Sequence, residues 1–167
     1  MQFRDACPAD APQIVALNLA SEHFLSPLDR TRFDQIRAQA ACCRVLETDG
    51  VIRAFLLAFR EGSQYDSSNY RWFASRFDRF LYIDRIVVAN AARSRGIGTA
   101  FYGDLLEFAK QSGTMRVTCE FDTYPPNLAS QKFHAAFGFA EVGVRQLATA
   151  GKTVSLQVLM LGAANTC

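Results

Sequence analysis

The feature that most constrains this fold is a buried strand that runs directly into a glycine-containing turn and a helix. Residues 80–89 are mostly apolar or aromatic, residues 93–98 read Arg-Ser-Arg-Gly-Ile-Gly, and an apolar stripe follows at Phe101, Leu105 and Phe108. Unpaired backbone N–H groups and the helix dipole favour an anion at such a helix start. Because glycine has no Cβ to block a phosphate, the segment predicts an anion-binding turn.

Two other phosphate-binding motifs do not fit the residues of this turn. A dinucleotide fingerprint needs a small residue at position 101, where the chain has Phe101, and an acidic residue after the next strand. A P-loop needs Gly-Lys-Ser/Thr, which is missing from the turn. A purely structural glycine turn stays open on these six residues alone.

The rest of the chain predicts one mixed sheet with helices on its faces. Residues 49–50 (Asp-Gly) between two apolar runs are a strong hairpin signal. The expected order is βααβββαβαββ. The strands are residues 3–6, 44–48, 51–59, 80–89, 115–122, 139–148 and 154–161; the helices begin near residues 8, 28, 98 and 127, the first ending at residues 26–27. Residues 61–77 are expected to be irregular and rich in aromatic rings.

Composition limits the class of protein. With 167 residues the chain is expected to form a single domain over residues 1–167, and 50% hydrophobic residues exclude a disordered chain. A net charge of +2 argues against nucleic-acid binding. A membrane span needs an apolar run of about 20 residues, and the sequence has none. No secretory signal is visible either, so we expect a cytoplasmic protein. The five cysteines match no metal-ligand spacing, so no metal is expected and the thiols are expected to be reduced.

A second motif follows the turn at a fixed distance. The alternating strand at residues 115–122 is followed by Asn127 and Ser130 at a helix start, and this helix ends in Phe137-Gly138-Phe139. The two motifs, in this order and separation, resemble the GNAT superfamily of N-acetyltransferases. The resemblance covers most of the chain except residues 61–77. It implies a central mixed, mostly antiparallel sheet whose strands at residues 80–89 and 115–122 splay apart.

The resemblance also implies how acetyl-CoA, the expected cofactor, would bind in that wedge. The backbone of Ile86, Val87 and Val88 would bond to the pantetheine arm. Asn127 and Ser130 would contact the pantetheine or lie beside the thioester. The pyrophosphate would be held by the turn and helix start, which comprise Arg93, Ser94, Arg95, Gly96, Ile97, Gly98 and Thr99.

The implied reaction is direct attack of a primary amine on the thioester carbonyl. An alkyl amine has a pKa of about 10, so a group must accept a proton. Asp84 and Glu120, on the two splayed strands, are the candidates for this base or for an amine anchor; an ion pair with Arg85 and a solvated strand face are the alternatives. Many family members have a tyrosine as the general acid where this chain has His134. An imidazole with a pKa of about 6.5 can protonate a thiolate, or it can only hydrogen-bond the cofactor.

Aromatic side chains are expected to form the acceptor site. The candidates are Phe24, Tyr65, Asn69, Tyr70, Trp72 and Phe73, with Tyr124 as a weaker one. A small primary amine is the expected substrate. The alternatives are a protein or peptide amine, a catalytically silent acyl-CoA-binding module, and an interaction domain without cofactor. Cys119 is expected to be a buried, inert thiol, and a homodimer through the last strands is what the resemblance implies.

Overall fold

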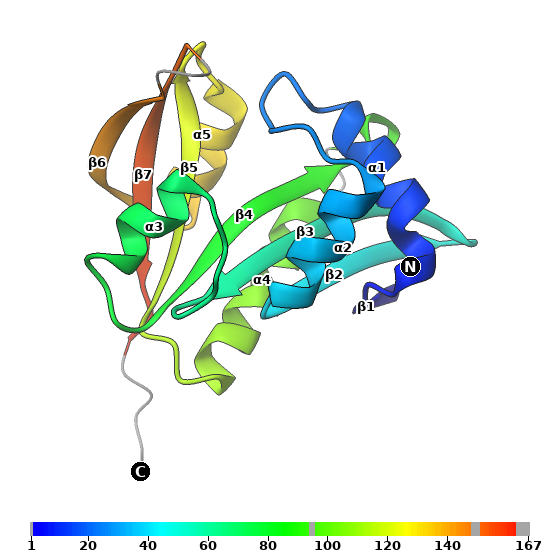
Figure 1. The fold of residues 1–167 in the computed structure, drawn as a ribbon, viewed down its shortest axis with the longest axis horizontal. Helices are drawn as coiled ribbons and strands as arrows, with labels where there is room; N and C mark the ends of the chain where they lie inside the picture. Colours follow the sequence, from blue (N-terminus) through cyan, green and yellow to red (C-terminus); the bar gives the residue numbers. More distant parts are fainter. Residues whose placement is uncertain (1, 94–95, 148–150, 163–167) are drawn as a thin grey trace.

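A computed structural model of the chain describes residues 2–93, 96–147 and 151–162. Its elements run in the order β1 (Gln2–Asp5), η1 (Pro8–Asp10), α1 (Ala11–Leu19), α2 (Arg30–Gln39), β2 (Cys42–Thr48), β3 (Val51–Arg60), α3 (Ser68–Ala74), β4 (Phe80–Val88), η2 (Asn90–Ala92), α4 (Ile97–Gln111), β5 (Arg116–Tyr124), α5 (Leu128–Ala136), β6 (Ala140–Leu147) and β7 (Lys152–Met160) (Figure 1). Among the described residues, no helix is both long and apolar enough to span a bilayer.

The seven strands form one sheet in the order β1-β2-β3-β4-β5-β7-β6. Neighbouring strands are antiparallel except β4 and β5, which are parallel. This confirms the predicted mixed, mostly antiparallel sheet. The predicted Asp-Gly hairpin joins β2 to β3, with both turn residues, Asp49 and Gly50, at positive φ.

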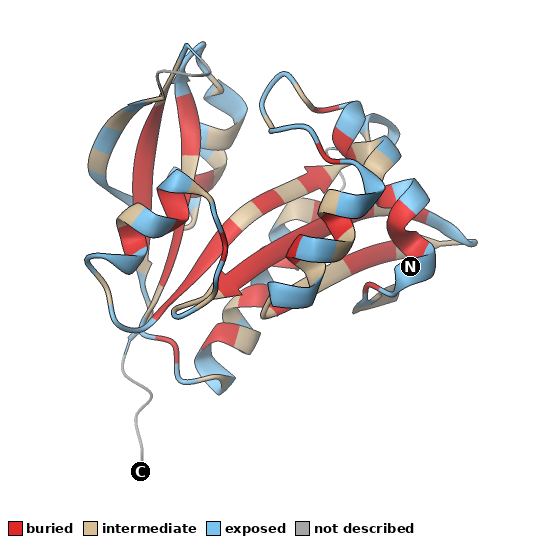
Figure 2. Ribbon diagram, in the orientation of Figure 1, coloured by how far each residue is buried: buried red, intermediate tan, exposed pale blue. Residues whose placement is uncertain are grey.

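Helices cover both faces of the sheet, as predicted. Along β3, Phe55, Leu57 and Phe59 belong to a core shared with α1, α2 and α3, whereas Leu56 and Ala58 belong to a core shared with α4. This alternation follows from the period of two along a strand. Figure 1 shows α1, α2 and α3 on the near side of the sheet and α4 on the far side. The buried strands between these layers are red in Figure 2.

The strands β4 and β5 separate after a short paired stretch. They pair at Phe80–Arg116, Leu81–Val117 and Tyr82–Thr118, and neither pairs with the other beyond this point. Beyond Tyr82, β4 still pairs with β3 along its other edge, and β5 still pairs with β7. The expected splay is therefore present, and one edge of each strand faces a wedge-shaped opening.

Three local predictions are wrong. Residues 61–77 contain the helix α3, because the Ser67 hydroxyl caps its first turn by accepting from the Tyr70 backbone N–H (3.3 Å). The first helix ends at Leu19, well before Ser26-Pro27, and leaves a loop from residue 20 to residue 29. The strand β5 is not half exposed: Thr118 and Asp122, on the expected polar face, are buried because other elements cover that face.

Candidate active site

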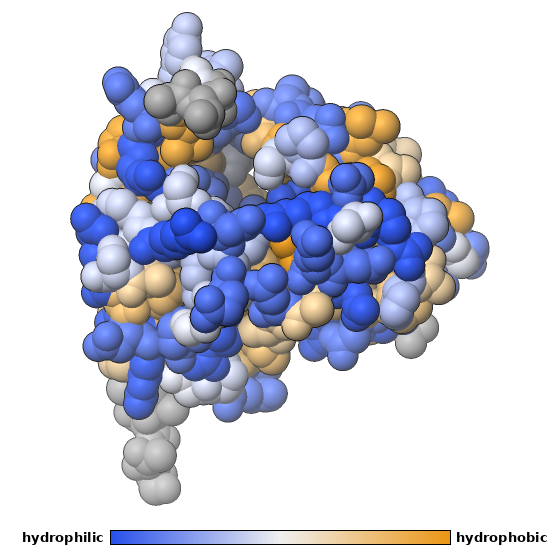
Figure 3. Space-filling view, viewed as in Figure 1, coloured by the Kyte–Doolittle hydropathy of each residue, from blue (hydrophilic) through white to orange (hydrophobic). Residues whose placement is uncertain are grey.

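The wedge between β4 and β5 opens into a cleft of about 680 Å³. Its walls come from both strands, the loop between α1 and α2, the start of α3, and the helices α4 and α5. The space-filling view shows the surface hollowed between the part of the molecule that carries β5 and β7 and the part that carries the first two helices (Figure 3). This volume is large enough for an extended cofactor arm together with a small second ligand.

Of the described residues of the predicted phosphate turn, Arg93 lines this cleft, and Gly96 and Gly98 do not. Gly96 is the N-cap of α4 and has a φ of 72°, a left-handed conformation that favours glycine. A Cβ on Gly98 would lie 3.3 Å from the ring of Phe133, so α4 and α5 approach closely here. Arg93 lines the cleft and donates from Nε to the Val88 carbonyl (3.3 Å). The predicted binding residues Ser94 and Arg95 lie outside the described residues.

Five of the other predicted cofactor contacts line the same cleft, whereas Ile97 and Thr99 do not. Ile86, Val87 and Val88 line it from β4. Ile97 is buried in the first turn of α4, so it can offer a ligand only its backbone. Thr99 is exposed in the same turn, so its side chain is also accessible. Asn127 and Ser130 line the cleft from the start of α5, where Asn127 Oδ1 accepts from the Ser130 backbone N–H (3.1 Å). The donor groups present fit a phosphate at one end and an extended amide-containing arm along β4.

His134 is buried with both ring nitrogens engaged. Its Nδ1 lies 2.8 Å from the Ser130 carbonyl oxygen, which can only accept, so Nδ1 carries the proton. Its Nε2 then accepts from the hydroxyl of Tyr102, 2.6 Å away. Burial lowers the pKa of His134, so the imidazole is neutral at pH 7. Tyr102, which also lines the cleft, was missed from the sequence because it lies within the apolar face of α4.

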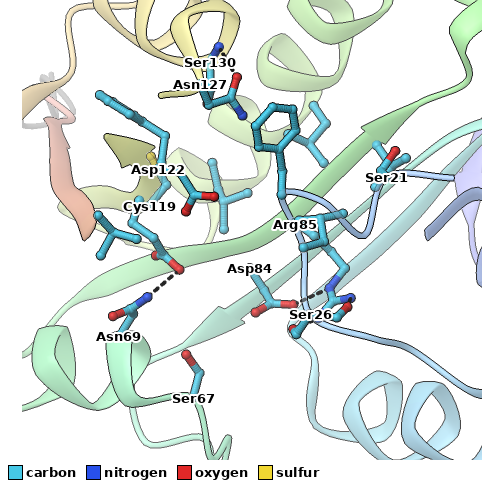
Figure 4. A pocket seen from close by; sticks show the side chains of 18 of the residues that line it. Ser21, Ser26, Ser67, Asn69, Asp84, Arg85, Cys119, Asp122, Asn127 and Ser130 are labelled. Carbon is cyan, nitrogen blue, oxygen red and sulfur yellow. Dashed lines mark hydrogen bonds and ion pairs between the residues drawn. The ribbon is translucent and has the colours of Figure 1, made fainter. Parts of the chain in front are cut away.

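Glu120 lines the cleft from β5, and its two carboxylate oxygens have different surroundings. Asn69, Asp84 and Asp122 lie around the same part of the cleft (Figure 4). The Asn69 side-chain amide and the Tyr82 hydroxyl both donate to Oε1, each over 2.9 Å. Oε2 is buried and has no hydrogen-bond partner among the described residues. Burial raises the pKa of Glu120 to about 7, partly opposed by those two hydrogen bonds. A carboxyl group that changes its charge near pH 7 is well matched to proton transfer.

Asp84, the other candidate base, is committed to an ion pair. Its Oδ2 accepts from Arg85 Nε and its Oδ1 from the Tyr65 hydroxyl, both over 2.6 Å. Arg85 is 5% exposed and also donates to Asn18 Oδ1 over 2.7 Å. The alternative of an ion pair with Arg85 is therefore present in the structure, and Arg85 also ties β4 to α1 through Asn18.

Asp122 and Lys152 form a second ion pair at the cleft. Lys152 Nζ donates to Asp122 Oδ2 over 2.8 Å and to the backbone carbonyl of His23 over 3.2 Å. This contact links the start of β7 to the loop between α1 and α2, across the cleft. Lys152 was missed because its partners are far away in the sequence.

The predicted acceptor residues are only partly brought together. Phe24 and Tyr65 line the cleft, and so do Ser67, Ser68 and Asn69 at the start of α3. Tyr70 and Phe73 do not line it: the turn of α3 directs both into the core, where they are 2% and 0% exposed. Trp72 packs against the backbone of Gly143 and under the guanidinium of Arg76 instead. Tyr124 is 67% exposed at the end of β5 and is also outside the cleft lining.

Comparisons with known proteins agree with this geometry. A model of the acetyltransferase (GNAT) family matches residues 12–139. None of the curated proteins compared with the chain matches it. The chain belongs to the GNAT acetyltransferase family, and acetyl-CoA is the cofactor of that family.

Solved structures of acetyltransferases have the same fold. Ard1 from Thermoplasma volcanium superimposes with a TM-score of 0.78 at 13% identity, covering 96% of this chain and 97% of that one. The ribosomal-protein-S18-alanine N-acetyltransferase from Escherichia coli gives 0.74 at 14% identity, covering 99% and 96%. The yncA protein of Salmonella typhimurium, solved with acetyl-CoA, gives 0.71 at 18% identity, covering 100% and 99%.

Proposed function

We propose that this protein transfers the acetyl group of acetyl-CoA to the primary amine of a small molecule, with Glu120 as the general base. The observation that carries the proposal is the Glu120 carboxyl group: buried in the cleft, with one oxygen held by two donors and the other without a partner. The predicted single-domain organisation of residues 1–167 and the homodimer stay predictions.

The residues that would hold the cofactor follow from the cleft. The backbone N–H groups at the start of α4, with Gly96 and Gly98, would bind the pyrophosphate, and Arg93 would add positive charge. The free edge of β4 at Ile86, Val87 and Val88 would bond to the pantetheine arm. When bound, acetyl-CoA supplies an acetyl group activated as a thioester.

Glu120 is suited to take the proton from the amine. An alkyl amine with a pKa of about 10 is mostly protonated at pH 7 and must lose a proton before it can attack. Glu120 Oε2 would accept this proton directly or through one water. Asp84 is less suited, because both of its oxygens already accept strong hydrogen bonds.

The chain also provides groups for the carbonyl oxygen and the leaving thiolate. Backbone N–H groups on the free edge of β4 can stabilise negative charge that develops on a carbonyl oxygen in the cleft. His134 remains the predicted acid for the thiolate. To give up a proton from Nε2, it would first have to be protonated and exchange its bond with Tyr102 for one with the thiolate.

The contact made by Lys152 favours a small acceptor over a protein. A peptide that entered between the loop after α1 and the start of β7 would meet this contact, because Lys152 joins the two segments at Asp122 and the His23 carbonyl. A compact amine needs only the volume beneath this contact, which Phe24, Leu147 and Val154 line together with the carboxylates. The mixed apolar and acidic walls suit an amine with an apolar body.

The test is thiol release from acetyl-CoA by the purified protein, with a panel of small primary amines and a panel of peptides. We expect release with at least one small amine, no release with peptides, and almost none from Glu120→Gln. Release with peptides alone would overturn the small-molecule assignment. Saturable binding of acetyl-CoA in calorimetry, without turnover of any amine, would instead establish a silent binding module.

A further inference from the structure

Two elements outside the family's two motifs are connected to the carboxyl group of Glu120, one directly and the other through it. Asn69 lies in the first turn of α3 and donates from Nδ2 to Glu120 Oε1 over 2.9 Å. Arg145 lies on β6, at the edge of the sheet, and donates from Nη1 to Asn69 Oδ1 over 2.8 Å and to the Ser68 carbonyl over 2.7 Å. A continuous path of hydrogen bonds thus connects β6, α3 and β5.

Arg145 decides which way the Asn69 amide points. A guanidinium can only donate, so the amide oxygen of Asn69 must face Arg145 and its NH₂ group must face Glu120. Asn69 is 6% exposed, which leaves little room for the amide to turn away. If the amide were reversed, its oxygen would face the carboxylate and its NH₂ group would face the guanidinium. Arg145 therefore holds the Asn69 amide in the orientation in which its NH₂ group donates to Glu120.

The two donors on Oε1 determine which oxygen is free. The Tyr82 hydroxyl approaches the same Oε1 from β4, also over 2.9 Å. Figure 4 shows Asn69 and Asp84 reaching toward the cleft from α3 and from β4. Because Asn69 and Tyr82 both bond to Oε1, Oε2 is left without a partner among the described residues of the cleft.

We propose that Asn69 and Arg145 are positioning residues for the base: Arg145 orients the Asn69 amide, and Asn69 holds Glu120 so that Oε2 faces the acceptor amine. This rests on the proposed function, in which Glu120 accepts the amine proton. It gives residues 61–77, which the family resemblance leaves without a counterpart, a role in setting the proton affinity of the base.

Several other titratable groups, with their partners, surround Glu120 and set the background for its titration. They are Asp84 with its partners Tyr65 and Arg85, Asp122 with its partner Lys152, and the Tyr82 hydroxyl. The two aspartates raise the pKa of Glu120, whereas the hydrogen bonds from Asn69 and Tyr82 lower it because they favour the ionised form. Loss of the Asn69 donor should move the pKa of Glu120 above its value of about 7.

The experiment compares pH profiles of kcat/KM for one small amine that the wild-type protein acetylates. Asn69→Leu removes the donor at similar size, and Arg145→Met removes the group that orients it. Arg71→Met is the matched control, because Arg71 is an exposed arginine on the same helix as Asn69. The same amine is used throughout, so its own ionisation contributes equally to every profile.

We expect the acid limb to move up by about one pH unit in Asn69→Leu, because a hydrogen bond to a charged group has about that effect on a pKa. Arg145→Met should shift it in the same direction by less, and Arg71→Met should leave it unchanged. The Kd for acetyl-CoA should stay the same in all three. A merely structural role would change yield or Tm without moving the acid limb.

Two results would overturn the proposal in distinguishable ways. If Glu120→Gln is inactive but Asn69→Leu and Arg145→Met both keep the wild-type acid limb, Glu120 is the base and these residues do not position it. If Glu120→Gln keeps wild-type activity, the base assignment itself fails and the positioning fails with it. Arg145 lies on an edge strand and is partly exposed, so Arg145→Met decides the matter if Asn69→Leu does not fold.

Discussion

The hydroxyl of Tyr102 lies 2.6 Å from Nε2 of His134, so the helix that follows the phosphate turn is hydrogen-bonded to the helix that begins at Asn127. The other ring nitrogen donates to the Ser130 carbonyl within α5. His134 is therefore held in a single tautomer between two helices. This arrangement makes the residue important for stability whatever its role toward the thiolate.

We expect His134→Ala to lower the free energy of unfolding by about 1–3 kcal/mol through the unpartnered Tyr102 hydroxyl, in addition to the loss of packing. Chemical denaturation of His134→Ala, Tyr102→Phe and the double variant would measure the coupling between the two side chains. A loss of stability in the double variant equal to the sum of the two single losses would contradict this coupling. The predicted acid role requires, in addition, that His134→Ala lowers kcat far more than it weakens acetyl-CoA binding.

Glu120→Gln should lower kcat/KM by about 100-fold to 10,000-fold, the range typical of a lost general base. The amide oxygen of the glutamine can still accept from Asn69 and Tyr82, so the fold and the affinity for acetyl-CoA should be retained. In the wild type, activity should rise with pH through about 7, because only the ionised carboxylate can accept a proton. A rate that does not change between pH 6 and pH 8 would contradict this assignment.

The raised pKa of Glu120 also predicts a pH-dependent stability. The folded state holds the proton up to a pH of about 7, whereas the unfolded chain releases it near 4.5, so stability falls as the pH rises through this window. The total is up to about 3 kcal/mol. Glu120→Gln removes this loss, so its Tm relative to wild type should be higher at pH 8 than at pH 5. An equal Tm difference at the two pH values would show that burial does not raise the pKa of this carboxyl group.

Gly98→Val should weaken acetyl-CoA binding and lower the Tm. A side chain at this position meets the Phe133 ring at 3.3 Å and pushes α4 from α5 where the pyrophosphate would lie. Gly103→Val is the control: it lies in the same helix, and a Cβ there meets nothing within 4 Å. Calorimetric titration with acetyl-CoA should show lost affinity only for Gly98→Val. Equal affinities in the two variants would remove this turn from the binding site.

The sequence predicted the structure correctly where the residue pattern lies within one strand, turn or helix. The strand β4, the helix that follows Gly96, the Asn127 cap and the Asp49-Gly50 turn are local features, and each is present in the structure as predicted. The short helix α3 was missed because seven residues with four apolar or aromatic side chains show no clear period. Tyr70 and Phe73 were expected in the acceptor site because this helix was not predicted; the helix directs both side chains into the core.

The environment of Glu120 could not be predicted in the same way. Alternation along β5 puts it on the polar face of a strand, which usually means contact with solvent. What buries it are Asn69 and Tyr82, which are 51 and 38 residues away in the sequence. The contacts of Lys152 and Arg145 span similar or longer distances. Such contacts depend on how whole elements pack, and no local pattern encodes them.

Only three residue pairs join β4 to β5, so the single sheet has one short seam between its two halves. One half carries β1 to β4 and the other carries β5, β7 and β6. A ligand that bonds to the free strand edges beyond Tyr82 and Thr118 would supply hydrogen bonds that the two strands do not make with each other. Filling the wedge would therefore join the two halves of the sheet more firmly, and the Tm of the protein should increase with the concentration of its cofactor.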